Sequence, residues 1–403
     1  MDKKTLALYG GKPIRKKRMP GRRLFGGEEL EAVTNLFELA WDDDQDFGFQ
    51  GIEEERYTNA FCNFQKEDGY ADAISTGSAA IFVAIQALHL PKNSPILVSP
   101  VTDPGSVTGA IILGHPIVIA DSMPNSFNIG PEQFEAAITD NMHAAILTHL
   151  GGIPLEMDPI MEIANAHNIM VIEDCSQAHG AYYNGRRVGC FGVIGAFSTM
   201  WSKAHSTGGC GGLVYTQDYN LYKQIRYASD RGKPLPSEDL EKKNPGLNYF
   251  PALNLNLDEL SCAIGKISLQ KVDDRLDKRC GIIQKIDDAI INCKSIKPCG
   301  EYPLSIPSPF FHTVKVLPDN LTVSKDEFCQ AIIAEGININ PDYRFVISEW
   351  PWIVPHLISP TQTPNATNFR NTSFNILFHE RYTNSDVEDV IKALIKVDSC
   401  LSQ

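Results

Sequence analysis

The stretch that decides the fold lies between Met170 and Gly212 and reads MVIEDCSQAHGAYYNGRRVGCFGVIGAFSTMWSKAHSTGGCGG. Its first residues, Met170 to Ile172, form an apolar run typical of a buried strand, and this run ends abruptly in Glu173 and Asp174. Ligands bind at the carboxyl ends of the strands in an open parallel sheet, so an acid at that point is a candidate functional residue. The stretch therefore predicts an α/β protein with Asp174 at its ligand-binding edge.

A second charged residue, Lys203, stands just before the glycine-rich turn of the same stretch. An acid and a lysine are what a pyridine cofactor needs, because its ring nitrogen must stay protonated and its aldehyde must be held by an amine. The pair predicts pyridoxal phosphate (PLP) chemistry. Taken singly, Asp174 is also compatible with a helix cap or loop acid, and Lys203 with a surface lysine.

A possible phosphate cradle lies upstream, where the predicted strand Tyr70 to Ile74 is followed by STGSAAI, residues Ser75 to Ile81. Small residues at the start of a helix expose backbone amides to an anion, and the helix dipole adds to the attraction. Gly77 and Ser78 are the candidates for holding the phosphate. The same small residues also serve as ordinary helix N-caps.

Short apolar strands alternate with helices through this part of the chain, which predicts a mostly parallel sheet covered on both faces. The predicted strands are Ile96–Val98, Pro116–Ala120, Ala144–Leu147 and Leu213–Tyr215, and helices are predicted at Thr108–Leu113, Pro131–Ile138, Pro159–Asn168 and Tyr219–Asp230. A periodic apolar face from Leu257 to Arg279 predicts one long helix. We expect an irregular arm (1–25), a large α/β domain (26–256), a linking helix (257–280) and a smaller C-terminal α+β domain (281–403).

Composition narrows the possible partners. The 403 residues carry a formal net charge of -13, which disfavours a general nucleic-acid or anionic-membrane surface. We expect a cytoplasmic protein, since no apolar run suits a signal peptide or a membrane span. The ten cysteines form no CxxC pair, so no metal site is expected. The GGCGG run fits neither the dinucleotide fingerprint nor the P-loop spacing.

Several phrases resemble the DegT/DnrJ/EryC1/StrS family of sugar aminotransferases, in the order that the family has them. They are TGSAAI (Thr76–Ile81), FNIGPEQFEAAI (Phe127–Ile138), THLGGIPLEMD (Thr148–Asp158), VIEDCSQAHGA (Val171–Ala181), GRRVGCFGVIGAFSTMWSKAHSTGGCGGLVYT (Gly185–Thr216) and NLNLDELSCAIGKISL (Asn254–Leu269). The resemblance covers nearly the whole chain. It implies the type I fold of PLP-dependent transferases, similar to that of aspartate aminotransferase.

The resemblance also implies roles for three residues of the stretch quoted first. Lys203 falls where the family has its Schiff-base lysine, and Asp174 matches the aspartate that pairs with the pyridine nitrogen. Gln177 matches the polar residue near the ring hydroxyl of the cofactor. Without the resemblance, Gln177 is an ordinary loop hydrogen-bonding residue.

Phosphate binding is implied at four positions. Gly77 and Ser78 sit where the family holds the phosphate by backbone and hydroxyl, and Ser198 matches the serine that joins them. Asn254 aligns with an asparagine that reaches the phosphate of the neighbouring subunit, which implies a homodimer with shared active sites. Asparagine is also common in turns, so a turn is the alternative for Asn254.

The chain departs from the family at three positions. The family commonly has an aromatic residue after a threonine to stack on the pyridine, but here Thr102 is followed by Asp103. Cys210 replaces an acid in the glycine-rich turn, and Asn256 replaces an arginine-like residue. These changes leave the cofactor chemistry in place and concern the substrate.

The predicted function is therefore transfer of an amino group from glutamate or glutamine to a keto sugar or keto cyclitol, through a Lys203 Schiff base. We expect the acceptor to be chosen by the loop Arg231–Pro251 and the segment Ile339–Trp352. A PLP-dependent sugar dehydratase is one alternative, although the resembling dehydratases have histidine in place of the lysine. A cofactor-binding regulatory protein without turnover is the other.

Overall fold

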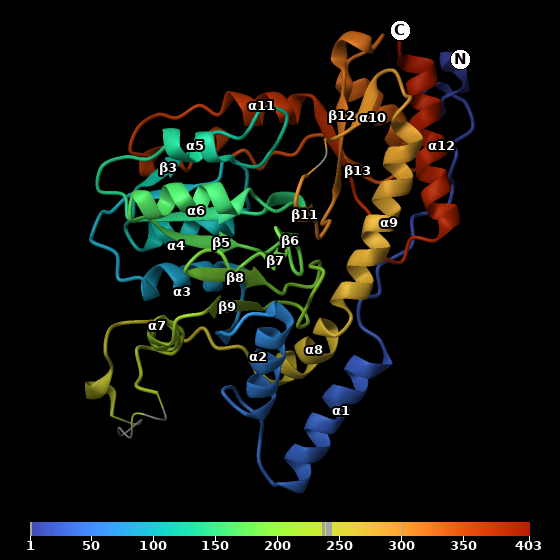
Figure 1. Ribbon diagram of the computed structural model, residues 1–403. Coiled ribbons are helices and arrows are strands. Elements are labelled where there is room, and N and C mark those ends of the chain that lie inside the picture. The colour runs from blue at the N-terminus through green and yellow to red at the C-terminus, as the bar shows by residue number, and fades with distance from the viewer. Residues whose placement is uncertain (1, 236–237, 239–243, 301) are drawn as a thin grey trace.

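The computed structural model describes residues 2–235, 238, 244–300 and 302–403, and a seven-stranded sheet forms its centre (Figure 1). The strand order is β1-β9-β8-β5-β4-β2-β3. The strands are β1 (Tyr70–Ile74), β2 (Ile96–Val98), β3 (Ile117–Ile119), β4 (Ala144–Thr148), β5 (Met170–Asp174), β8 (Ile194–Ser198) and β9 (Gly212–Thr216). The expected α/β class with a mostly parallel sheet is confirmed.

Strand direction decides where polar side chains gather. β9 pairs antiparallel with both β1 and β8, while the remaining neighbours pair parallel. β9 is therefore the one strand of this sheet that runs the other way, and β1 points in the same direction as the parallel five. The carboxyl ends of six strands consequently meet at one edge, which is where an open sheet of this kind binds its ligand.

Apolar residues on alternate positions bury both faces of the sheet. Ile96 and Val98 pack into a core with α3 (Gly77–Ala87), α4 (Pro104–Ile112) and α7 (Tyr219–Ser229), whereas Leu97 packs on the opposite face. That second face is covered by α5 (Pro131–Ala136) and α6 (Met157–Ala166). Successive side chains of a strand point to opposite faces, so this short run serves both cores.

The predicted long helix is two helices, α8 (Glu259–Leu269) and α9 (Val272–Ile290). Lys271, with φ -99° and ψ 0°, leaves helical geometry between them. The sequence does not reveal this break, because the apolar periodicity continues across it. Leu269 before the break and Val272 after it are both buried. α8 packs against α1 (Gly27–Asp42) and α2 (Ile52–Gln65), and α9 runs on toward the second sheet (Figure 1). The domain boundaries expected above remain a prediction.

A four-stranded antiparallel sheet forms the C-terminal part, in the order β10 (Ile296–Pro298), β12 (His312–Val316), β14 (Ser373–Ile376) and β13 (Ile339–Asn340). Its core takes apolar residues from α9, α10 (Lys325–Ala334) and α12 (Asn384–Leu401), and from Leu6 of the N-terminal arm. The arm therefore packs against this sheet, and the two termini lie close together at α12 (Figure 1).

The remaining elements are short. β6 (Tyr182–Tyr183), β7 (Arg186–Arg187) and β11 (Ser305–Ile306) form a small third sheet, and α11 (Pro364–Asn371) precedes β14. No helix in the described part of the chain is long and apolar enough to cross a membrane.

Candidate active site

A cavity of about 270 Å³ opens at the carboxyl edge of the large sheet, at the ends of β1, β5 and β8. The structure brings six of the seven predicted site residues to its wall. They are Gly77, Ser78, Asp174, Gln177, Ser198 and Lys203. The seventh, Asn254, lies outside this wall. The roles assigned to these residues remain predictions, and the geometry below shows what each can do.

The start of α3 forms one side of the cavity. Thr76 caps the helix by accepting a hydrogen bond from the backbone N–H of Ala79 at 3.0 Å, which leaves Gly77 and Ser78 in the first turn facing the cavity. A Cβ atom on Gly77 would lie 2.4 Å from the Cβ of Ser198. Glycine thus lets the helix start and the end of β8 approach closely, and the free N–H groups and hydroxyls there suit a phosphate.

Asp174 ends β5 and is held on both carboxylate oxygens. Its Oδ1 accepts from the backbone N–H of Ser176 at 3.0 Å, and its Oδ2 accepts from the hydroxyls of Ser106 and, at 3.4 Å, of Thr148. Thr102 joins the same hydroxyl network. These donors fix the orientation of the carboxylate, as one that faces a cationic ring nitrogen requires.

Lys203 is buried in the loop that follows β8, and its Nζ lies 4.6 Å from the centre of the Phe310 ring. No described residue accepts a hydrogen bond from this Nζ. Burial lowers the pKa of the Lys203 amine, against the opposing effect of the Asp174 and Asp103 carboxylates. A larger fraction of neutral amine is thereby available for nucleophilic and base chemistry.

The Lys203 loop is positioned by arginines that the sequence did not single out. Nη1 of Arg22, from the N-terminal arm, donates to the Lys203 carbonyl at 2.7 Å, and Nη1 of Arg275 donates to the Ala204 carbonyl at 2.9 Å. Glu380 pairs with Arg22 at 3.0 Å and with Arg279 at 2.8 Å. These arginines bind backbone carbonyls or residues that are distant in the sequence. No local sequence motif therefore indicates their role.

Gln177 and Tyr343 link the cavity to the C-terminal segment. Oε1 of Gln177 accepts from the Gly151 N–H at 2.9 Å, and Gln177 also interacts with the Tyr343 hydroxyl. The segment containing Tyr343 runs beside the end of β2, where the Thr102 N–H donates to the Phe345 carbonyl at 3.1 Å. Part of the expected acceptor segment Ile339–Trp352 therefore lies beside the cavity. The other expected segment, Arg231–Pro251, falls partly outside the described residues.

Asp103 caps α4, so the helix starts earlier than the predicted Thr108. Its Oδ1 accepts from the Gly105 N–H at 2.9 Å, and Pro104 occupies the first helical position. A proline there and a capping aspartate before it both favour a helix start, although proline and glycine in succession are equally typical of a turn.

Asn254 is exposed on the segment between α7 and α8, and its Oδ1 accepts from Nδ2 of Asn256 at 2.7 Å. Two large apolar side chains, Leu253 beside it in the chain and Trp201 in the Lys203 loop, are 56% and 63% exposed. Asn254 is not among the residues that line the cavity of its own chain.

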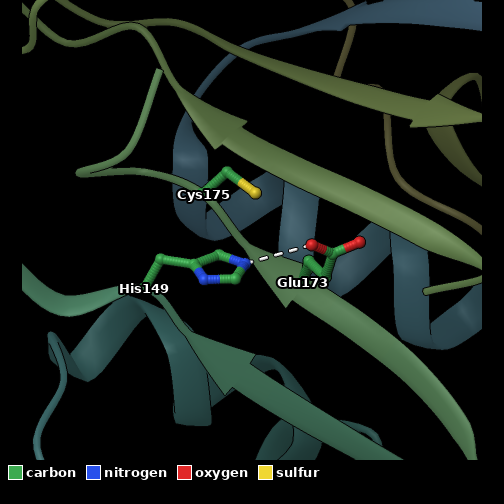
Figure 2. A group of neighbouring side chains, drawn as sticks. All are labelled: His149, Glu173 and Cys175. Atoms are coloured by element: carbon green, nitrogen blue, oxygen red, sulfur yellow. Dashed lines mark hydrogen bonds and ion pairs between the residues drawn. The ribbon is translucent and has the colours of Figure 1, made fainter. Parts of the chain in front are cut away.

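Among the described residues, a buried cluster of potential metal ligands, His149, Glu173 and Cys175, lies at the ends of β4 and β5 (Figure 2). Nε2 of His149 lies 3.0 Å from Glu173 Oε2, and its Nδ1 accepts from the Leu155 N–H at 3.1 Å. Glu173 also accepts backbone N–H bonds from Gly189, Phe191 and Gly192. Burial raises the pKa of the Cys175 thiol. With both histidine nitrogens and both carboxylate oxygens engaged, the cluster serves as a hydrogen-bonded support for the end of β5.

Comparison with known proteins decides the family. The model of the DegT/DnrJ/EryC1/StrS aminotransferase family matches residues 30–395. The chain belongs to this family. The spore coat polysaccharide biosynthesis protein SpsC of Bacillus subtilis is 26% identical over 92% of this chain and 94% of that protein. The GDP-perosamine synthase of Caulobacter vibrioides is 26% identical over 92% of this chain and 95% of that protein.

A solved aminotransferase from Psychrobacter cryohalolentis superposes with a TM-score of 0.87 at 28% identity, covering 94% of this chain and 98% of that one. The expected fold of PLP-dependent aminotransferases and the expected enzyme class are confirmed. The resemblance carried by the phrases around Asp174 and Lys203 is confirmed as well.

The cavity fits the cofactor that this family implies. A buried lysine amine without a hydrogen-bond acceptor among the described residues, an oriented carboxylate across the cavity and a glycine-lined helix start meet three separate requirements of PLP. These requirements are an amine for its aldehyde, an acid for its ring nitrogen and donors for its phosphate.

Proposed function

We propose that this aminotransferase uses PLP to transfer an amino group from glutamate or glutamine to a keto sugar or keto cyclitol. The observation that carries the proposal is the meeting of Lys203, Asp174 and the Gly77–Ser78 helix start in one cavity. SpsC and GDP-perosamine synthase, named for polysaccharide and amino-sugar synthesis, support a carbohydrate-like acceptor.

Each residue has a separate task. The N–H groups and hydroxyls of Gly77, Ser78 and Ser198 bind the phosphate, and Asp174 keeps a proton on the ring nitrogen. When bound, PLP supplies an electron sink that makes the carbon beside the substrate nitrogen acidic. Lys203 would hold the cofactor through its side-chain amine while no substrate is bound. Once the donor amine has displaced it, the free Lys203 amine would take a proton from the donor carbon in the first half of the reaction and would deliver a proton to the acceptor carbon in the second half.

Two features make Lys203 suited to both proton transfers. Burial favours its neutral amine, and the carbonyl contacts from Arg22 and Arg275 to the loop hold the backbone from which the side chain projects. Because donor and acceptor are handled in turn at the same place, one base serves both halves of the reaction.

Substitution of Lys203 by alanine tests the proposal. We expect Lys203→Ala to bind PLP weakly and to lose transamination by about a thousandfold, the typical scale of a lost acid–base group. Turnover is measured as the transfer of the amino group from glutamine or glutamate to each member of a panel of keto sugars and inososes. The wild type should show an absorbance band near ~420 nm, from the lysine-bound cofactor, that bleaches on adding the donor.

Lys392→Ala is the matched control, because Lys392 is exposed on α12 and pairs only with Glu388 among described residues. It should retain wild-type turnover. Full turnover by Lys203→Ala would overturn the assignment of the base.

We also propose that the functional unit is a homodimer in which Asn254 reaches the phosphate of the partner chain. The exposure of Asn254 and of the apolar side chains Leu253 and Trp201 supports a contact with a second copy. The same contact would complete the site, because Asn254 lies away from the cavity of its own chain.

A further inference from the structure

Asp103 holds a fixed position at the mouth of the cavity. The preceding residue, Thr102, is anchored through its N–H to Phe345 and through its hydroxyl to Ser106 and Thr148, at 2.7 and 2.9 Å. Pro104 restricts the backbone on the other side. The carboxylate therefore projects from a rigid frame, as a residue that selects a ligand must.

Only one oxygen of this carboxylate is engaged. Oδ1 caps α4 through the Gly105 N–H, whereas no described residue donates to Oδ2 and no described cation forms an ion pair with Asp103. The side chain is exposed, yet it lines the same cavity as Lys203. A helix cap needs one oxygen, so the second oxygen is available to a ligand.

The charges of the cavity wall are unequal. Among its described residues only Asp103, Asp174 and Lys203 are charged, and no arginine is present. Asp174 already accepts several hydrogen bonds, and Lys203 is the residue proposed to hold the cofactor. Once Lys203 holds the cofactor, no other basic side chain of the described wall remains. A second carboxylate on a substrate would thus meet the charge of Asp103 without a basic partner from this wall.

We propose that Asp103 is a specificity-determining residue that makes the site select its amino donor by charge, favouring glutamine over glutamate. The inference rests on the proposed function and refines it. The two donors share their α-amino and α-carboxylate groups, so the difference lies in the side chain. The amide of glutamine can donate a hydrogen bond to Oδ2 of Asp103, whereas the carboxylate of glutamate can only be repelled.

The carboxylate of Asp103 also affects how the acceptor would bind. An aromatic side chain at position 103 would offer neither charge nor a hydrogen-bond acceptor beside Lys203. Asp103 supplies both, and an uncharged polyhydroxy acceptor would meet the same oxygen with hydroxyl donors. One residue thus favours neutral, hydrogen-bond-donating groups in both halves of the reaction.

The test is Asp103→Asn in the PLP-loaded enzyme. Asparagine keeps the helix cap and removes the charge. We expect the ratio of kcat/KM for glutamine over that for glutamate to fall about tenfold, chiefly through a lower KM for glutamate. The Kd of glutarate, which has both carboxylates but no amine, should fall by a similar factor in calorimetry. Both effects should shrink at high ionic strength.

Asp218→Asn is the control, since Asp218 caps α7 in the same manner but does not line the cavity. It should leave the donor ratio unchanged. An unchanged donor ratio and glutarate Kd in Asp103→Asn would overturn the proposal and leave Asp103 as a helix cap only. If the wild type used neither donor, the proposed function would fail, while glutarate binding would still decide the role of Asp103.

Discussion

At position 77 the chain has no room for a side chain larger than hydrogen. A Cβ added there would lie 2.4 Å from the Cβ of Ser198, far inside van der Waals contact, and both residues belong to elements fixed by the sheet. We expect Gly77→Ala to displace the start of α3 from Ser198 and to weaken PLP binding about tenfold or more. Titration of the apoenzyme with PLP, followed by absorbance, measures this change.

Gly27→Ala provides the comparison, because Gly27 stands in the first turn of α1 and an added Cβ would meet no atom within 4 Å. It should leave PLP affinity at the wild-type level. Equal affinity of Gly77→Ala and the wild type would show that the phosphate is held elsewhere.

The sequence predicted the placement of those candidate residues whose neighbours in sequence are also their neighbours in space. Asp174 is the last residue of its strand, and Gly77 and Ser78 follow theirs by a short turn, so a local pattern placed them at the sheet edge. The hydroxyls that orient Asp174 come from Ser106 and Thr148 on other elements. Their roles depend on strand order, which a single sequence does not reveal.

At the scale of elements, Glu380 joins the N-terminal arm, α9 and the segment before α12. Burial alone would raise the pKa of Glu380, but Arg279 and Arg22 outweigh it and hold the pKa at about 2. The ordinary value is 4.5, so the folded form binds the proton less readily than the unfolded chain does. Its stabilising effect is complete above the unfolded pKa and is lost as the pH falls through the folded one.

We therefore expect Glu380→Gln to lower the free energy of unfolding near pH 7 by up to about 3 kcal/mol. The difference from the wild type should narrow below about pH 4.5 and vanish near pH 2. Urea unfolding at several pH values measures it. Glu388→Gln is the control, because its pair with Lys392 is 63% and 60% exposed and should matter little. A pH-independent loss in Glu380→Gln would contradict the ion-pair explanation.

Secondary-structure elements were predicted best where apolar residues and turn residues indicate the same boundaries. The predicted bounds of β1 and β2 match the structure, since turn residues or polar residues enclose each of these short strands. β8 was missed because its run Ile194–Ser198 is short, contains Gly195 and lies among glycines. In the C-terminal sheet, β13 has only two residues and pairs with β14. So short a strand has no recognisable alternation of apolar and polar residues.

For the molecule as a whole, the direction of the strands and the packing of the arm serve the same site. Six strand ends meet at one edge, and Arg22 brings the N-terminal arm to the Lys203 carbonyl. The arm packs on the C-terminal sheet through Leu6. The position of Lys203 is therefore coupled to contacts with segments far away in the sequence on both sides.

A shared active site makes a prediction that a monomer cannot satisfy. If Asn254 binds the phosphate held by the partner chain, Lys203→Ala and Asn254→Asp damage the two sites of a dimer in different ways. Aspartate keeps the size of the side chain and places a negative charge against the phosphate, so Asn254→Asp should be nearly inactive alone. Each variant still supplies the group that the other lacks.

Mixing the two inactive variants, with reversible dissociation to exchange subunits, should restore about a quarter of wild-type activity. Random pairing makes half the dimers mixed, and each mixed dimer has one site with Lys203 from one chain and Asn254 from the other. Turnover at increasing mixing ratios, with size-exclusion chromatography to measure the dimer, checks this expectation. The double variant Lys203→Ala, Asn254→Asp mixed with either single variant should restore none, since no site then has both residues. Failure of the two single variants to complement, in dimers shown to exchange, would place Asn254 outside the partner's site.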